Sequence, residues 1–174
     1  EYSLYEDDIS KDVYLNLIGT VHNNLDSLYD YLDFRKEMLN LNELHMYDLH
    51  VELSKPNDKK YSFTEAEAII MEALKPLGST YLEDLSQAFK KRWIDRYNND
   101  GKRSGAYEWG TYGVEPYVSV NFEGDYTSVS TVIHELGHAM HSYYSNKKQA
   151  FVNSSYAIFL AEIDSTVIEV LLND

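Results

Sequence analysis

Hydrophobic positions in the first forty residues recur at the spacing of an α-helix. Ser10 can cap a stretch in which the apolar residues share one face. The same period resumes after Asn23 and Asn24, so we expect two helices or one broken helix in this region. The apolar positions that carry the two stretches are Val13, Leu17, Ile18, Val21, Leu25, Leu28, Tyr29, Leu32 and Leu39.

The hydrophobic period changes to two between His45 and Leu53. Tyr47, Leu49 and Val51 alternate there with polar residues, which predicts a half-buried strand. The following segment, residues 54–60, has the composition of a turn or an exposed loop.

Two capping-box signatures, each a threonine followed three residues later by a glutamate, predict the next two helices. The first helix is expected to start at Thr64 and to reach about Leu74, where Pro76 stops it. The second is expected to start at Thr80 and to run to about Tyr97.

The second half of the chain is predicted to contain two short strands and two helices. The strands are expected at residues 106–109 and 117–121, with a glycine-bearing loop between them. The helices are expected at about residues 128–144 and 156–172. The predicted fold is therefore mainly α, with a small β-sheet beside the helix over 128–144.

That helix carries the strongest chemical signal in the chain, the H-E-x-x-H motif of His134, Glu135 and His138. Residues four apart lie one turn apart on the same face of a helix, so the two imidazoles can bind one metal ion. Glu135 falls beside them, where it can accept a proton from a metal-bound water. The alternative is a buried helix that contains two core histidines without a metal.

A catalytic metal site needs a third protein ligand. His141 lies on the same face, but seven residues of helix rise about 10.5 Å, too far for it to share an ion with His134. His141 either supports the site from outside or is a packed polar residue. The remaining candidates are the acids of the last helix. Glu162 and Glu169 share a face, while Asp164 is interpreted as a solvated or capping carboxylate.

Composition narrows the class of protein. Of the 174 residues, 44% are hydrophobic and 14% aromatic, which is enough for a packed core. The net charge of −14 disfavours binding to nucleic acid or to an anionic membrane surface. The absence of cysteine excludes disulfides and thiolate metal ligands. We find neither a membrane-spanning apolar run nor a secretory signal, and we expect a cytoplasmic protein.

Four segments resemble the oligoendopeptidase F branch of the thimet-oligopeptidase family of zinc metallopeptidases. They are HELGHAMHSYYS, FLAEIDSTVIEVLL, KRWIDRYNNDGKRSGAYEWGTYGVEPYVSVNF and LHMYDLHVEL. The resemblance implies a zincin-like fold and an endopeptidase that acts on oligopeptides with one Zn²⁺ ion. It implies that His134, His138 and Glu162 bind the ion, that Glu135 is the base, and that Glu169 orients a ligand histidine.

The resemblance also implies a strand at the edge of the substrate cleft, with Gly105, Ala106 and Tyr107 pairing with an extended peptide through main-chain hydrogen bonds. The family pattern usually reads closer to AEVAST where this chain has Ile163 and Asp164. Members of the family are several times longer than this chain. Their C-terminal half closes the cleft and supplies histidine and tyrosine groups that bind the substrate.

We therefore expect residues 1–174 to be a fragment of one larger catalytic domain, with parts missing at both ends. The apolar residues Val167, Ile168, Val170, Leu171 and Leu172 cover more than one face of the last helix, and we expect chain beyond Asp174 to cover them. Two alternatives remain. One is a metal-binding fragment that cannot cleave peptides alone, and the other is a helical interaction module in which the motif is fortuitous.

Overall fold

A computed structural model describes residues 9–54 and 58–173 of the chain. The chain divides into two compact units, residues 1–57 and residues 58–174, and each is described by itself. Within the described ranges, no helix combines the length and the apolar content that crossing a membrane would require.

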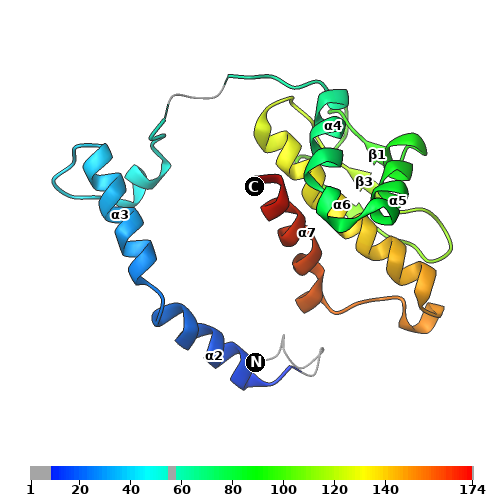
Figure 1. The fold of residues 1–174 in the computed structure, drawn as a ribbon, viewed down its shortest axis with the longest axis horizontal. Helices are drawn as coiled ribbons and strands as arrows, with labels where there is room; N and C mark the ends of the chain where they lie inside the picture. Colours follow the sequence, from blue (N-terminus) through cyan, green and yellow to red (C-terminus); the bar gives the residue numbers. More distant parts are fainter. Residues whose placement is uncertain (1–8, 55–57, 174) are drawn as a thin grey trace. The chain divides into compact units, whose positions relative to one another are not determined.

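Residues 9–54 of the first unit contain two α-helices, as the broken hydrophobic period predicts. Helix α2 spans Lys11–His22 and helix α3 spans Asp26–Met38 (Figure 1). The Ser10 hydroxyl caps α2 by accepting a hydrogen bond from the backbone N–H of Asp12 at 3.2 Å. This bond satisfies one of the N–H groups that the first turn leaves without a helical partner.

The strand predicted between His45 and Leu53 is wrong. The segment forms a 3-10 helix, η1, over Met46–His50. The Asp48 carboxylate accepts a bond from the backbone N–H of His45 at 2.8 Å, which closes the turn. The buried guanidinium of Arg35 in α3 donates to the carbonyls of Asp48 at 2.8 Å and Val51 at 2.6 Å. These bonds to a side chain take the place of the ladder that a strand would need.

The second unit begins with α4, which spans Phe63–Ala73. Its capping box is formed by Ser62 and Glu65, two residues before the predicted signature at Thr64, which lies inside the helix. Ser62 with Glu65 and Thr64 with Glu67 both match the capping-box pattern, and the packing of the helix decides which pair forms the cap. Phe63 is buried in the core at 4% exposure, on the face that the earlier start of the helix turns inward.

Helix α5 spans Ser79–Lys90 and follows a short 3-10 helix, η2, over Lys75–Leu77. The predicted cap at Thr80 is wrong, because the residue before the helix is Gly78, which has a φ of +90° and no side chain to cap with. Glycine adopts this backbone conformation without the strain that a Cβ would cause.

The predicted extension of α5 to Tyr97 is also wrong. Arg92 has a φ of +62°, which breaks the helical path, and Ile94–Asp95 then form a strand, β1. Strand β1 runs parallel to Tyr117–Ser119, β3, with Ile94 opposite Val118. The sequence pattern misses this strand because two residues carry no period of their own.

The sheet has the order β1-β3-β2, with β2 over Tyr107–Trp109. Strands β2 and β3 are antiparallel, with Glu108 opposite Val118. The two predicted strands are thus confirmed with slightly shorter bounds. Strand β2 lies at an edge of this sheet, which leaves one side of its backbone without a strand partner within the described chain.

The last two helices run side by side (Figure 1). Helix α6 spans Tyr126–Lys148 and helix α7 spans Ile158–Asn173, with a 3-10 helix, η3, at Phe151–Asn153 between them. The Asp125 carboxylate caps α6 through the backbone N–H of Ser128 at 2.7 Å. Helix α6 contacts strands β2 and β3 as well as α7. The predicted fold class, mainly helical with a small sheet beside the motif helix, is confirmed.

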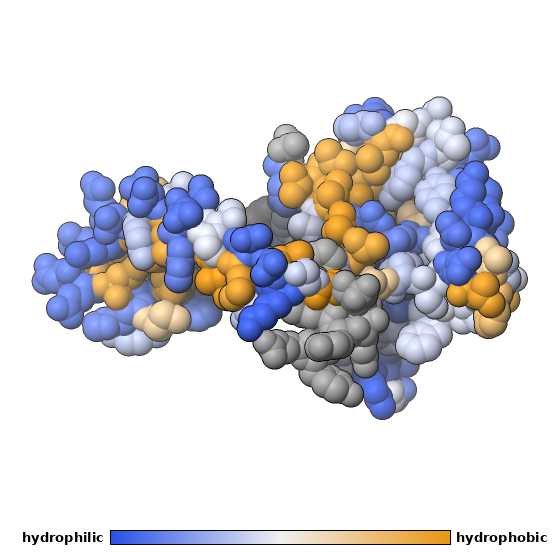
Figure 2. Space-filling model, turned by 90° about the horizontal axis from the view of Figure 1, so that it is seen from below, coloured by the Kyte–Doolittle hydropathy of each residue, from blue (hydrophilic) through white to orange (hydrophobic). Residues whose placement is uncertain are grey.

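The core of this unit is continuous from α4 to α6. It contains residues of α4, α5, β3 and α6, among them Ile70, Leu85, Val118, Val132, Ile133 and Leu136, all fully buried. On α7, Ile168 is buried, whereas Val167 is 49% and Val170 is 56% exposed. Figure 2 shows that hydrophobic side chains lie on the surface of the molecule. The expectation that chain beyond Asp174 covers these residues stays a prediction.

Candidate active site

The two histidines of the motif converge on one point in space. His134 and His138 lie one turn apart on α6, and their Nε2 atoms are 3.1 Å from each other. The side chains are only 27% and 15% exposed. Val132, Ile133, Leu136 and Ala139 are fully buried around them, which fixes the helix and therefore the direction of both imidazoles.

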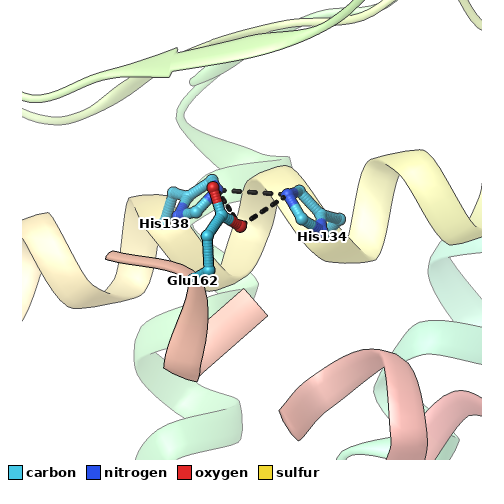
Figure 3. Close-up of side chains that lie close together, drawn as sticks. All are labelled: His134, His138 and Glu162. Carbon is cyan, nitrogen blue, oxygen red and sulfur yellow. Dashed lines mark hydrogen bonds and ion pairs between the residues drawn. The ribbon is translucent and has the colours of Figure 1, made fainter. Parts of the chain in front are cut away.

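Glu162 comes to the same point from α7. Its Oε2 lies 3.4 Å from Nε2 of His134 and 3.5 Å from Nε2 of His138 (Figure 3). The three ligand atoms lie within 4.8 Å of one another, so the three residues could hold a metal ion. The Ser165 hydroxyl donates to Oε2 of Glu162 at 2.9 Å and helps to hold this carboxylate in place.

Glu169 contacts the other ring nitrogen of His134, the one that does not face Glu162. Its Oε1 is 3.3 Å from Nδ1 of His134 and 3.5 Å from the Ser130 hydroxyl. A carboxylate at Nδ1 favours the imidazole that carries its proton there, which leaves Nε2 with a free lone pair. Nε2 is the atom that faces His138 and Glu162.

Glu135, the predicted base, is buried on α6 with 6% of its surface exposed. Burial raises the pKa of its carboxyl, the charge of Glu162 adds to the rise, and His134 opposes it. Burial also lowers the pKa of His138, which favours the neutral imidazole that binds metal ions. The arrangement therefore combines three electron-donating groups that can bind a cation with the Glu135 carboxyl, whose pKa is raised.

His141 does not join the three clustered residues. Its Nδ1 lies 2.9 Å from Oδ2 of Asp164, and its ring stacks on Tyr156 with 3.7 Å between ring centroids. His141 thus connects α6 to α7 and to the segment before it. The Asp164 side chain is 47% exposed, as expected for a solvated carboxylate, but the packing of the two helices also brings it against the His141 imidazole.

Gly137, inside the motif, is a residue that the sequence analysis overlooks. A Cβ built there would lie 2.7 Å from the Cα of Ser165 and 2.9 Å from Cδ1 of Ile168. Only glycine allows the backbone of α7 to approach α6 this closely, and this approach brings Glu162 within reach of the two imidazoles. A glycine inside a helix, which costs helical stability, is the signal that could have revealed it.

Gly137→Ala should therefore lower the free energy of unfolding by about 1–3 kcal/mol, because α7 must move away from α6. The same movement should weaken metal binding. Thermal or urea unfolding measures the first effect. Gly19→Ala in α2 is the matched control. A Cβ meets nothing within 4 Å there, and alanine should stabilise that helix by up to about 1 kcal/mol. Equal stability of the wild type and Gly137→Ala would refute the close-approach argument.

The three residues expected to bind a peptide lie at the start of the edge strand. Gly105 has a φ of +89°, Ala106 packs against the core, and Tyr107 is 50% exposed in β2. The amide of Asn121 donates to the carbonyls of Arg103 and Gly105 at 2.9 Å each, which fixes the loop before the strand. Tyr107 belongs to the sheet, Gly105 and Ala106 to the loop that precedes it, and none of the three lies in the cluster of histidines and glutamate.

Glu108, in the same strand, is a second residue that the sequence analysis overlooks. Its Oε1 is buried and accepts no hydrogen bond within the described part of the chain. Burial raises the pKa of Glu108 to about 7, the Ser142 hydroxyl opposes the rise, and Glu135 adds to it. The alternation of a strand predicts that the Glu108 side chain lies on the other face of the sheet from Tyr107 and Trp109. It does not predict that this face packs against α6.

The raised pKa of Glu108 makes the stability of the fold depend on pH. Between the usual pKa of 4.5 and about 7, the folded chain holds a proton that the unfolded chain releases. The stabilisation is therefore complete below pH 4.5 and is lost as the pH rises through 7. Each unit of pKa corresponds to about 1.36 kcal/mol, and solvent at the partly exposed carboxyl screens part of this.

The free energy of unfolding of Glu108→Gln should rise by about 1–2 kcal/mol relative to that of the wild type between pH 5 and pH 8.5. Urea unfolding at both pH values tests this, and a difference that does not change with pH contradicts it.

The chain is similar in sequence to known peptidases. The chain is 40% identical over all its 174 residues to oligopeptidase PepF of Bacillus subtilis, and 43% identical over 171 residues to an oligoendopeptidase F homologue of Borreliella burgdorferi. It spans only 26% and 29% of the length of these two relatives.

The fold matches solved structures as well. A crystal structure of a protein from Chlamydophila abortus, assigned as a peptidase, superposes with a TM-score of 0.89 at 44% identity, over 98% of this chain and 29% of that one. An oligoendopeptidase F structure from Bacillus anthracis, at 20% identity, shares the fold with a TM-score of 0.73, over 93% of this chain and 30% of that one. The sequence model of peptidase family M3 matches residues 1–174, and the chain belongs to this family.

Proposed function

We propose that this chain carries the metal centre of a zinc-dependent endopeptidase that hydrolyses internal bonds of short peptides. The observation that carries the proposal is the convergence of His134, His138 and Glu162, whose ligand atoms lie within 4.8 Å of one another. Two imidazole nitrogens and one carboxylate oxygen are a donor set that zinc prefers in catalytic sites. Membership of peptidase family M3 supports the same chemistry.

The surrounding residues suit this donor set. Glu169 at Nδ1 of His134 and Ser165 at Oε2 of Glu162 hold two of the three groups in their orientations. Burial lowers the pKa of His138, which favours its neutral imidazole. When bound, zinc supplies a Lewis acid that acidifies a water and polarises the scissile carbonyl.

Glu135 is the proton carrier in this proposal. It takes a proton from the attacking water as the new C–O bond forms, and it gives this proton to the departing amine as the C–N bond breaks. The carboxylate is thereby restored at the end of each cycle. A carboxyl whose pKa is raised by burial is better matched to both transfers at neutral pH than an exposed one.

We further propose that residues 1–174 are part of one larger, mainly helical catalytic domain. The two curated relatives compared above are more than three times as long, and they are named as oligopeptidases. The remainder of such a domain would close the cleft over an oligopeptide. The peptide would pair with the free side of β2 through Gly105, Ala106 and Tyr107, because that edge lacks a strand partner within the described chain.

The experiment combines metal analysis with the cleavage of a quenched fluorescent peptide, on the 174-residue chain and on the full-length protein. We expect one zinc per chain in both, and efficient cleavage by the full-length protein only. Zinc without cleavage by either protein would favour a metal-binding module without catalysis. No stoichiometric metal would favour a helical interaction module with a fortuitous motif.

A further inference from the structure

A cavity of about 480 Å³ lies where the end of β2, the second half of α6 and the segment before α7 meet. Hydrogen bonds between these segments hold its walls together. Asn146 of α6 donates to the carbonyl of Thr111 at 3.3 Å, and the Ser145 hydroxyl donates to the carbonyl of Ser154 at 2.6 Å. A cavity of this size accommodates a large side chain.

The walls of the cavity are aromatic, with one acidic group. Trp109, Tyr112, Phe151 and Tyr156 provide the aromatic part of the surface, Glu108 provides the carboxyl, and the remaining lining residues are glycine, serine, threonine and asparagine. The rings of Tyr112 and Phe151 meet edge to face at 5.4 Å, so this part of the wall is packed. Such a surface suits the methylene groups of a long side chain and the face of a guanidinium group.

The carboxyl of Glu108 lacks a counter-charge. No ion pair joins it to a lysine, arginine or histidine in residues 9–54 or 58–173, and its buried Oε1 accepts no hydrogen bond there. The Ser142 hydroxyl lies 3.0 Å from the Tyr156 hydroxyl and also interacts with the Glu108 side chain, but it brings no positive charge. A buried carboxylate without such a partner is costly, and a cation in the cavity would remove much of this cost.

The cavity adjoins the candidate metal centre. Ser142, on its wall, lies one turn beyond His138 on the same face of α6. The charge of Glu135 is close enough to act on the carboxyl of Glu108. A side chain held in the cavity would thus belong to a substrate residue near the bond that is cleaved.

We propose that this cavity is a specificity site for a substrate side chain that ends in a cation, lysine or arginine, with the Glu108 carboxylate as its counter-charge. The proposal rests on the proposed peptidase function. The aromatic walls bind the stem of the side chain, and the carboxylate binds its ammonium or guanidinium group through charge-assisted hydrogen bonds.

The experiment measures kcat/KM of the full-length protein with matched quenched peptides. Lysine, arginine or norleucine is placed in turn at each of the three positions on either side of the scissile bond. Norleucine keeps the apolar stem of lysine and lacks the charge. We expect one position at which lysine or arginine is preferred over norleucine by about tenfold or more, as a charge-assisted bond implies.

Glu108→Gln tests the residue. The amide keeps the shape of the carboxyl and removes its charge, so the preference at that position should fall to within about threefold. Glu123→Gln, which removes an exposed carboxylate after β3, is the matched control and should keep the wild-type preference. Circular dichroism and zinc content establish that both variants are folded.

The outcomes separate the two proposals. If the wild type cleaves no peptide of the series, the proposed function fails. If it cleaves peptides but shows no preference for a cation at any position, or if Glu108→Gln keeps that preference, the specificity site is overturned while the peptidase function stands.

Discussion

Glu135→Gln in the full-length protein is expected to lower kcat by about a hundredfold or more and to leave zinc content unchanged. The amide has the shape of the carboxyl but cannot accept the proton of the attacking water, and removal of a general base costs on this order. Glu135 is not one of the three clustered ligand groups, so the metal should remain. Steady-state kinetics on a quenched peptide and metal analysis of the same preparation measure the two quantities.

Glu135→Asp separates loss of the proton acceptor from general damage. The shorter carboxylate can still accept a proton, although from a less favourable position, so its kcat should lie between the wild type and Glu135→Gln. Turnover of Glu135→Gln close to that of the wild type would show that Glu135 is not the base.

Glu162→Gln is expected to weaken zinc binding by more than a hundredfold, and Glu169→Gln by about ten- to a hundredfold. Glu162 faces Nε2 of both imidazoles, whereas of the two imidazoles Glu169 contacts that of His134 alone, at Nδ1. Loss of a ligand should cost more than loss of a group that orients a ligand, for which ten- to a hundredfold is typical. Competition with a chromophoric chelator measures both affinities.

Glu83→Gln, at an exposed position of α5, is the control for the loss of one negative charge and should leave the affinity within about twofold of the wild type. A larger loss for Glu169→Gln than for Glu162→Gln would reverse the two roles and make Glu169 the third ligand.

Helical periodicity predicts much of this molecule because it is local. The bounds of α2, α6 and α7 follow within a few residues from apolar spacing and from the Ser10 cap. The errors occur where a non-local contact decides. The segment from His45 to Leu53 has the alternation of a strand, but Arg35 binds its carbonyls and no neighbouring strand pairs with it in the described chain. The two residues of β1 become a strand only through β3.

The candidate site divides in the same way. His134, Glu135 and His138 lie together because one turn of helix brings residues four apart to one face, and this requires no tertiary contact. Spacing alone puts Glu162 and Glu169 on one face of the last helix and leaves open which of them is the third ligand. The packing of α7 on α6 at Gly137 and Ser165 brings Glu162 to Nε2 of both imidazoles and Glu169 to Nδ1 of His134.

What the sequence by itself determined is thus the fold class, the motif helix and the two histidines with their glutamate, since these depend on local geometry and on residue chemistry. Only the tertiary structure decided the partner of His141, which of the two histidines Glu169 faces and the position of Glu108 on a cavity wall. Each of these depends on how closely two backbones approach. That distance is set by the side chains packed between them, and it leaves no periodic signal in either segment.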